Sequence, residues 1–86
     1  MNYLDIIGLF AGACITFSTI PQILKVWKTK KVKDISLRTF GILTFGIFIW
    51  IIYGILKKDL PIIITNSISF CLNLIMIYFI IYFEKE

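Results

Sequence analysis

Three long runs without a charged residue constrain this sequence more than any other feature. They cover residues 6–24, 39–56 and 60–83 and contain 19, 18 and 24 residues. At about 1.5 Å of rise per helical residue, each run reaches roughly 27 to 36 Å, which matches a hydrocarbon core of about 30 Å. A chain of 86 residues with a mean hydropathy of +0.94 has too much apolar surface to bury in a soluble domain. The sequence therefore predicts three transmembrane helices.

We expect one all-α membrane domain over residues 1–86, because no internal repeat or second domain is visible. We expect helices at about residues 4–27, 37–57 and 61–83. A basic loop at 28–36 joins the first two helices, and a tight turn at 57–60 joins the last two. Pro61 suits the first turn of the third helix, where a missing N–H costs nothing. Asp34 or Ser36 is expected to cap the second helix.

The basic residues indicate the orientation in the membrane. Six of the nine lie in or beside the first connection, namely Lys25, Lys28, Lys30, Lys31, Lys33 and Arg38. The second connection has only Lys57 and Lys58, next to Asp59. We therefore expect a multi-pass protein of the cell inner (plasma) membrane. The positive-inside bias places its first loop and its tail 84–86 in the cytoplasm and its N-terminus outside the cell. This topology explains the net charge of +4 better than nucleic-acid binding does, and the lysines also attract anionic membrane lipids.

Each predicted helix carries one polar or aromatic stripe at spacings of three and four residues. On the first helix the stripe consists of Ser18 and Gln22, with Thr16 and Thr19 beside them. On the second helix it consists of Thr39, Leu43, Gly46, Trp50, Tyr53 and Lys57. On the third helix it consists of Asn66, Ser69 and Asn73. Polar groups facing lipid are costly, so the stripes are expected to face protein or a water-filled cavity. Alternatively, they only bond neighbouring helices to one another.

Trp50 and Asn66 are expected at the same depth. Trp50 lies six residues before the end of its run and Asn66 six residues after the start of its own. Both therefore lie about 9 Å below one membrane rim. An aromatic face stacks on the C–H face of a sugar ring, and a carboxamide bonds hydroxyls. The pair suits a small polar solute, whereas the alternative for Trp50 is an anchor at the membrane interface.

The sequence lacks residues that several classes of function require. No Asp, Glu, His, Lys or Arg lies in the middle of a run, which favours passive transport over proton coupling if the chain is a carrier. Cys14 and Cys71 are expected to be inert packing residues. With no histidine and no Cys/His cluster, we expect no metal, no cofactor and no enzymatic activity. Asp5 and the absence of a leading positive charge argue against a cleaved signal peptide.

Two backbone features of the first helix have alternative interpretations. Pro21 cannot donate to the carbonyl of Phe17, which predicts a kink that is either static or a hinge. Gln22 is one candidate partner for the freed carbonyl. Gly8 and Gly12 form a G-x-x-x-G pair, which marks either a subunit contact or packing within the protomer. Three helices cannot comfortably surround a solute pathway, so transport requires that copies assemble.

An ordered set of short motifs resembles the bacterial SemiSWEET sugar transporters of the PQ-loop superfamily. The motifs are Pro21-Gln22, Asp34-Ile35-Ser36, Trp50-x-x-Tyr53-Gly54, Asp59-Leu60-Pro61 and Asn66. The resemblance covers nearly the whole chain. It implies a three-transmembrane-helix bundle that assembles as a parallel homodimer around a central pathway. It also implies transport of mono- or disaccharides by alternating access, and the absence of charged residues from the middle of the runs makes passive uniport the expected mode.

The resemblance also implies roles for individual residues. They are substrate binding for Trp50 and Asn66, a hinge at Pro21 and Gln22, an outer gate of Tyr53, Lys57 and Asp59, and an inner gate at Thr39 and Leu43. We add Ser18 as a third substrate contact on the first helix. Relatives commonly have Arg at position 57, and Lys57 lacks the planar fork that pairs two ways with a carboxylate. Relatives also often have larger residues at the inner gate, so Phe40 is a candidate for blocking there.

Other functions remain compatible with three spans and a charged tail. A holin-like pore-forming protein needs neither a matched Trp and Asn nor a hinge. An accessory subunit of a larger membrane complex would use the stripes only for packing. Other PQ-loop proteins carry amino acids or act as receptors. The sequence specifies neither the preferred sugar nor the conformation that the protein adopts.

Overall fold

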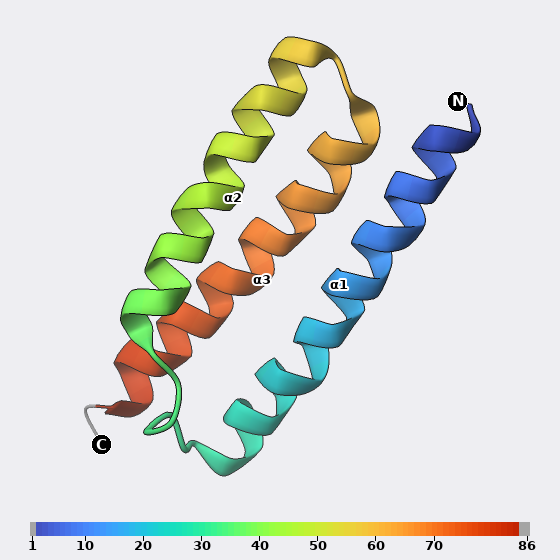
Figure 1. The fold of residues 1–86 in the computed structure, drawn as a ribbon. Coiled ribbons are helices and arrows are strands. Elements are labelled where there is room, and N and C mark those ends of the chain that lie inside the picture. Colours follow the sequence, from blue (N-terminus) through green and yellow to red (C-terminus); the bar gives the residue numbers. More distant parts are fainter. Residues whose placement is uncertain (1, 85–86) are drawn as a thin grey trace.

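The computed structural model describes residues 2–84 and consists of three long helices joined by two short connections (Figure 1). The helices are α1 (Tyr3–Thr29), α2 (Leu37–Lys57) and α3 (Leu60–Glu84). All three are long and apolar enough to cross a membrane. Each agrees with one of the three predicted spans. Residues 85 and 86 of the predicted cytoplasmic tail lie outside the described residues.

Side-chain and backbone caps extend α1 at both ends beyond the expected bounds. The Asn2 side chain accepts a hydrogen bond from the Asp5 N–H at 3.0 Å, and the Asp5 carboxylate accepts one from the Asn2 N–H at 3.3 Å. This capping box satisfies two donors of the first turn and starts the helix at Tyr3. At the other end Lys30 adopts a left-handed conformation with φ of 58°, and its N–H donates to the Val26 carbonyl at 2.7 Å. This reversal ends the helix.

The starts of α2 and α3 are also fixed by short polar side chains. Of the two candidates, Ser36 caps α2, because its hydroxyl accepts from the Thr39 N–H at 3.1 Å. Asp59 caps α3 by accepting from the Ile62 N–H at 3.3 Å. Pro61 lies in the first turn of α3, where its missing N–H breaks no helical bond. The two helices are thus separated only by Lys58 and Asp59.

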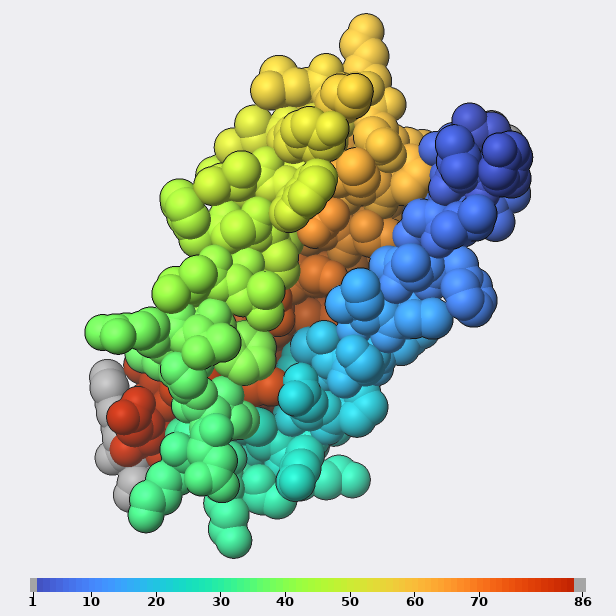
Figure 2. Space-filling model, in the orientation of Figure 1, coloured from blue at the N-terminus to red at the C-terminus, as the bar shows by residue number. Residues whose placement is uncertain are grey.

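The central element of the bundle is α3. It packs against both other helices, whereas α1 and α2 do not approach each other closely within residues 2–84. α1 and α3 run in the same direction and α2 runs against them (Figure 1). Seen as a surface, α1 and α2 form two walls of a groove whose floor is α3 (Figure 2). The groove runs along much of the bundle.

Small residues bring α1 close to α3 in the half of the bundle that holds the N-terminus. Gly8 lies against Pro61, and Gly12 lies against Thr65. One turn further on, the hydroxyls of Thr16 and Ser69 form a hydrogen bond of 3.2 Å. The G-x-x-x-G pair therefore serves packing within the protomer, which decides between the two interpretations of the sequence.

In the half of the bundle that holds the basic loop, α1 and α3 pack through apolar side chains. Ile23 and Val26 of α1 form a buried cluster with Met76 and Ile80 of α3. Val32 of the first connection completes the cluster. α1 is continuous through Pro21, and the helix stays packed against α3 on both sides of it. The protomer's main core thus lies at the end where the basic loop covers α3.

The close approach at Gly12 predicts a specific stability effect. A Cβ atom there would collide with the Thr65 side chain, whereas a Cβ at Gly41 would meet nothing within 4 Å. We expect Gly12→Ala to destabilise the protein by about 1–3 kcal/mol, as overpacking does. Gly41→Ala should be neutral or stabilising by up to about 1 kcal/mol, because alanine favours helix. Thermal unfolding in detergent measures both, and equal midpoints would contradict the packing described.

Candidate functional site

The floor of the groove is the face of α3 between its two packing surfaces. Pro61, Thr65 and Ser69 contact α1, while Ile62 and Ile63 approach Gly54 of α2, and the Phe70 ring lies 6.0 Å from that of Phe48. At about 100° per residue, Asn66 and Asn73 fall between these two directions. Both amides therefore lie on the floor of the groove, two helical turns apart.

The α2 wall presents the aromatic stripe. Gly54 and Thr44 are buried on the side of α2 that faces α3. Trp50 and Tyr53 lie about a quarter turn away by helical periodicity, toward the groove. Their rings pack edge to face with centroids 5.1 Å apart and, with Gly46 and Ile49, line a shallow depression of about 370 Å³. Trp50 is 53% exposed, so its ring is available for a contact outside the protomer.

Two polar side chains of the groove have unused hydrogen-bonding capacity. The Asn66 Nδ2 donates to the Ile62 carbonyl at 2.9 Å, which leaves its Oδ1 and a second N–H. The Ser18 hydroxyl donates to the Ile15 carbonyl at 2.6 Å, so it is left as an acceptor. By the same periodicity, Ser18 and Gln22 lie on the groove side of α1. The expected substrate contacts are therefore distributed over both walls and the floor.

The predicted hinge residues lie in an unbroken helix. Pro21 and Gln22 are both exposed. The hydroxyls of Ser18 and Thr19 both donate to the Ile15 carbonyl, in the turn before the proline. Such bonds to a preceding carbonyl loosen a helix locally. Two features that weaken helical bonding thus coincide just before the inner half of α1.

The predicted gate residues lie at opposite ends of α2. At the end next to the turn into α3, Tyr53 and Lys57 are exposed, while the half-buried Asp59 caps α3. At the end next to the basic loop, Thr39 and Leu43 are exposed on the groove side. Phe40 is half-buried and packs against the core cluster of the protomer.

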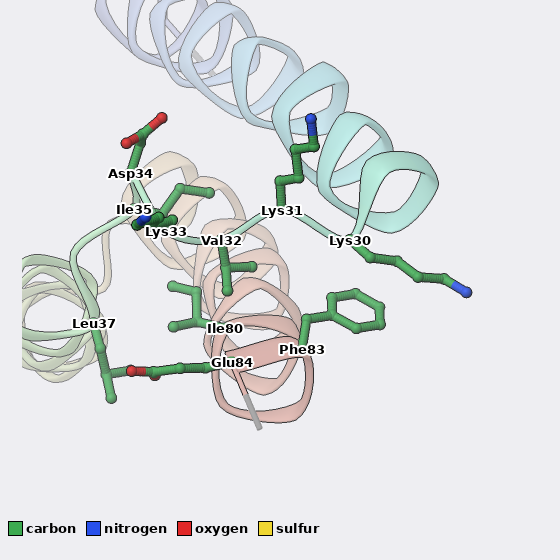
Figure 3. A pocket seen from close by; sticks show the side chains of 10 residues that line it. All are labelled: Lys30, Lys31, Val32, Lys33, Asp34, Ile35, Leu37, Ile80, Phe83 and Glu84. Carbon is green, nitrogen blue, oxygen red and sulfur yellow. The ribbon is translucent and has the colours of Figure 1, made fainter. Parts of the chain in front are cut away.

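A second and larger cavity of about 700 Å³ lies at the loop end of the bundle, far along α3 from Asn66. Its sides are formed by the first connection and the last turns of α3 (Figure 3). Lys30, Lys31 and Lys33 supply positive charge there, and Ile80 and Phe83 form an apolar floor. No group of three or more His, Cys, Asp or Glu that could bind a metal occurs in the described part of the chain.

Known proteins match the chain over almost its full length. Residues 2–86 match the family model of sugar efflux transporters for intercellular exchange. The sugar transporter SemiSWEET of Bradyrhizobium diazoefficiens is 39% identical over 69 residues, 80% of each chain. The protein of the same name from Leptospira biflexa is 37% identical over 75 residues, 87% of this chain and 88% of that one.

Solved structures share the fold. A crystal structure of a bacterial homologue of SWEET transporters matches with a TM-score of 0.92 at 40% identity, covering 95% of this chain and 99% of that one. A SemiSWEET crystallised in the inward-open conformation matches with a TM-score of 0.86 at 27% identity, covering 99% and 91%. The three-helix arrangement around a central α3 is therefore common to these proteins.

Asp59 is both the cap of α3 and a predicted gate residue, and two substitutions test whether it acts as a cap. Asp59→Asn retains an oxygen that accepts from the Ile62 N–H, so the free energy of unfolding should be nearly unchanged. Asp59→Ala removes the cap and should cost about 1 kcal/mol. Thermal unfolding in detergent compares the two. If Asn and Ala are equally destabilising, the carboxylate acts through its charge and not as a cap.

Proposed function

We propose a mechanism for this chain from the premise that it belongs to the SemiSWEET family of sugar transporters. Sugar transport across a membrane is its function, and it is not an enzyme. The mechanism has two copies of the chain enclosing one pathway, which alternates between openings on the two sides. The observation that carries it is the groove, in which polar and aromatic side chains of all three helices face away from the protomer's own core.

A second copy of the chain is the natural cover for this groove. One protomer leaves Trp50 half-exposed and the partly buried Asn66 amide on the floor of the groove, an arrangement that is costly against lipid. Because both copies carry their basic loop at the same end, the positive-inside bias orients them in parallel, with N-termini outside and C-termini in the cytoplasm. A twofold axis along the membrane normal then makes the two grooves face each other across a shared pathway.

The substrate contacts follow from the chemistry at the Trp50 level. Each subunit supplies an indole face, which stacks on the C–H face of a sugar ring. Each also supplies the free oxygen and N–H of Asn66, which bond sugar hydroxyls. The acceptor of Ser18 lies about 7 Å further toward the basic loop in the register set by the Thr16–Ser69 bond, where it bonds hydroxyls at the inner side of the sugar. These groups bind uncharged polyols, either mono- or disaccharides. They offer no charge for an ion.

The two gates close the pathway above and below this level. Tyr53, Lys57 and Asp59 from both subunits form the outer gate. Thr39 and Leu43 from both subunits form the inner gate, and Phe40 supports them from the core side. No Asp, Glu, His, Lys or Arg lies mid-membrane to couple transport to protons, so the sugar moves down its own gradient.

A bend of α1 at the Pro21 hinge also displaces α3, because the two helices are packed together beyond the proline. Ile23 and Val26 follow the proline and lie in one cluster with Met76 of α3. A bend at Pro21 therefore carries the inner half of α3 with α1, while α2 is less constrained because its backbone does not approach that of α1 closely. Opening inward is then a relative movement of this α1–α3 unit and α2. Collective motions of this kind take microseconds to milliseconds.

Substitutions at the Trp50 level test the substrate site. We expect Trp50→Ala and Asn66→Ala each to lower counterflow of labelled glucose or sucrose in proteoliposomes by about tenfold or more, since each removes about 1.4 kcal/mol or more of sugar contact from two subunits. Trp27→Ala is the matched control, because Trp27 is equally exposed but lies off the groove near the inner end of α1. If neither substitution reduces flux of any transported sugar, the proposed site is wrong.

Replacement of the proline tests the hinge. Pro21→Ala restores the helical hydrogen bond to the Phe17 carbonyl and stiffens α1. We expect slower exchange in liposomes with an unchanged dimer on size-exclusion chromatography. Unaltered transport would reduce Pro21 to a static feature of the helix.

A further inference from the structure

Asn73 is the one buried polar residue of the described chain whose side chain the fold leaves without a partner. It is only 5% exposed. The other two buried polar residues are satisfied, because Thr16 bonds the Ser69 hydroxyl and Thr44 donates to the Phe40 carbonyl at 2.6 Å. Among residues 2–84, no hydrogen bond reaches the Asn73 amide.

The Asn73 amide nevertheless reaches the molecular surface. No side-chain nitrogen or oxygen of the described residues is both sealed from the surface and without a partner. The small exposed part of Asn73 must therefore include its unpaired amide atoms. An amide at this depth is costly in hydrocarbon, so the opening it faces has to supply hydrogen-bonding groups.

The helical position of Asn73 identifies that opening as the groove. Asn73 follows Asn66 by seven residues, which is two turns, so both amides share one face of α3. The rise of about 1.5 Å per residue places Asn73 roughly 10 Å further toward the basic loop. The lipid-facing side of α3 is different, since it carries the exposed residues Ile68, Cys71 and Ile75.

Gln22 supplies a second free amide at the same depth. The Thr16–Ser69 bond sets α1 and α3 in register, and four residues further along these parallel helices Ile20 lies level with Asn73. Gln22 follows within one turn on the groove side of α1, and its exposed side chain makes no hydrogen bond within residues 2–84. The depth of the proline therefore coincides with a second ring of polar groups.

We propose that Asn73, together with Gln22, forms a second sugar-binding level, which receives the substrate's hydroxyl groups as it moves inward from Trp50 and Asn66. This proposal rests on the proposed function and adds a step to it. Unlike Trp50 at the first level, Asn73 and Gln22 have no aromatic ring and offer hydrogen bonds alone. The second level is thus a transient binding site, whose amides replace water around the sugar but do not stack on its ring.

Such a role predicts a particular kinetic change. Asn73→Leu keeps the size of the side chain and removes both hydrogen-bonding groups. We expect the maximal rate of sugar counterflow to fall about tenfold or more, the factor that corresponds to about 1.4 kcal/mol. The half-saturating sugar concentration should stay the same, because the first level is intact. Thermal stability should be equal or higher, because an unpaired amide has been removed.

Thr44→Val is the matched control, because it removes a buried polar group that is already satisfied by its own helix. It should leave the maximal rate unchanged. Unchanged flux in Asn73→Leu would overturn the proposal. So would a parallel loss of flux and thermal stability, which indicates a structural residue. Neither result affects the proposed function, which the Trp50 and Asn66 substitutions test separately.

Cysteine labelling tests the position without relying on activity. In a background of Cys14→Ser and Cys71→Ser, Asn73→Cys should react with a charged, water-soluble methanethiosulfonate, and added sugar should slow the reaction. The control is the Cys14→Ser protein, whose remaining Cys71 lies two residues away on the lipid side and should not react. Failure of Asn73→Cys to react, or a rate that sugar does not change, would overturn the proposal.

Discussion

A polar side chain inside a bilayer needs a partner, because the surrounding hydrocarbon supplies none. In this protein some of these groups are satisfied within the protomer, as for Thr16 with Ser69 and for Thr44 with its own helix. Asn66 and Ser18 are satisfied only in part. The partly satisfied groups lie along one groove. The proposed second copy meets this requirement, because it supplies a wall that excludes lipid and encloses a hydrated interior that solvates the groups that remain.

The position of α3 is what makes such a groove possible. It packs against both other helices and keeps the backbones of α1 and α2 apart. The contact with α1 is close because Gly8 and Gly12 have no Cβ atoms. The proposed alternating access uses this arrangement, because no close backbone contact between α1 and α2 opposes a change of angle between α2 and the α1–α3 unit.

The sequence predicted the three spans correctly because charge cannot be placed in hydrocarbon, and this constraint depends on composition alone. It predicted the ends of the helices less well, since α1 is extended by the Asn2 capping box and by the left-handed Lys30, both of which depend on local geometry. The role of Gly8 and Gly12 was undecided because a helix pattern does not reveal which neighbour it faces. The same limitation applies to Phe40, whose packing against the core became visible only once the rotation of α2 was known. The helical rise paired Trp50 with Asn66 at one depth and the resemblance assigned them to substrate binding, whereas the second level at Asn73 required knowledge of burial and hydrogen bonding.

The central claim is that two copies of the chain face each other groove to groove. Disulfide trapping across the twofold axis tests it most directly, because a disulfide forms only where two Cα atoms approach within about 7 Å. In protein lacking Cys14 and Cys71, Leu43→Cys on the groove side of α2 should cross-link to its own copy, stop sugar counterflow, and regain activity on reduction. Cross-linking of Phe45→Cys, on the opposite side of α2, with no cross-link at position 43 would show that the copies meet through another face.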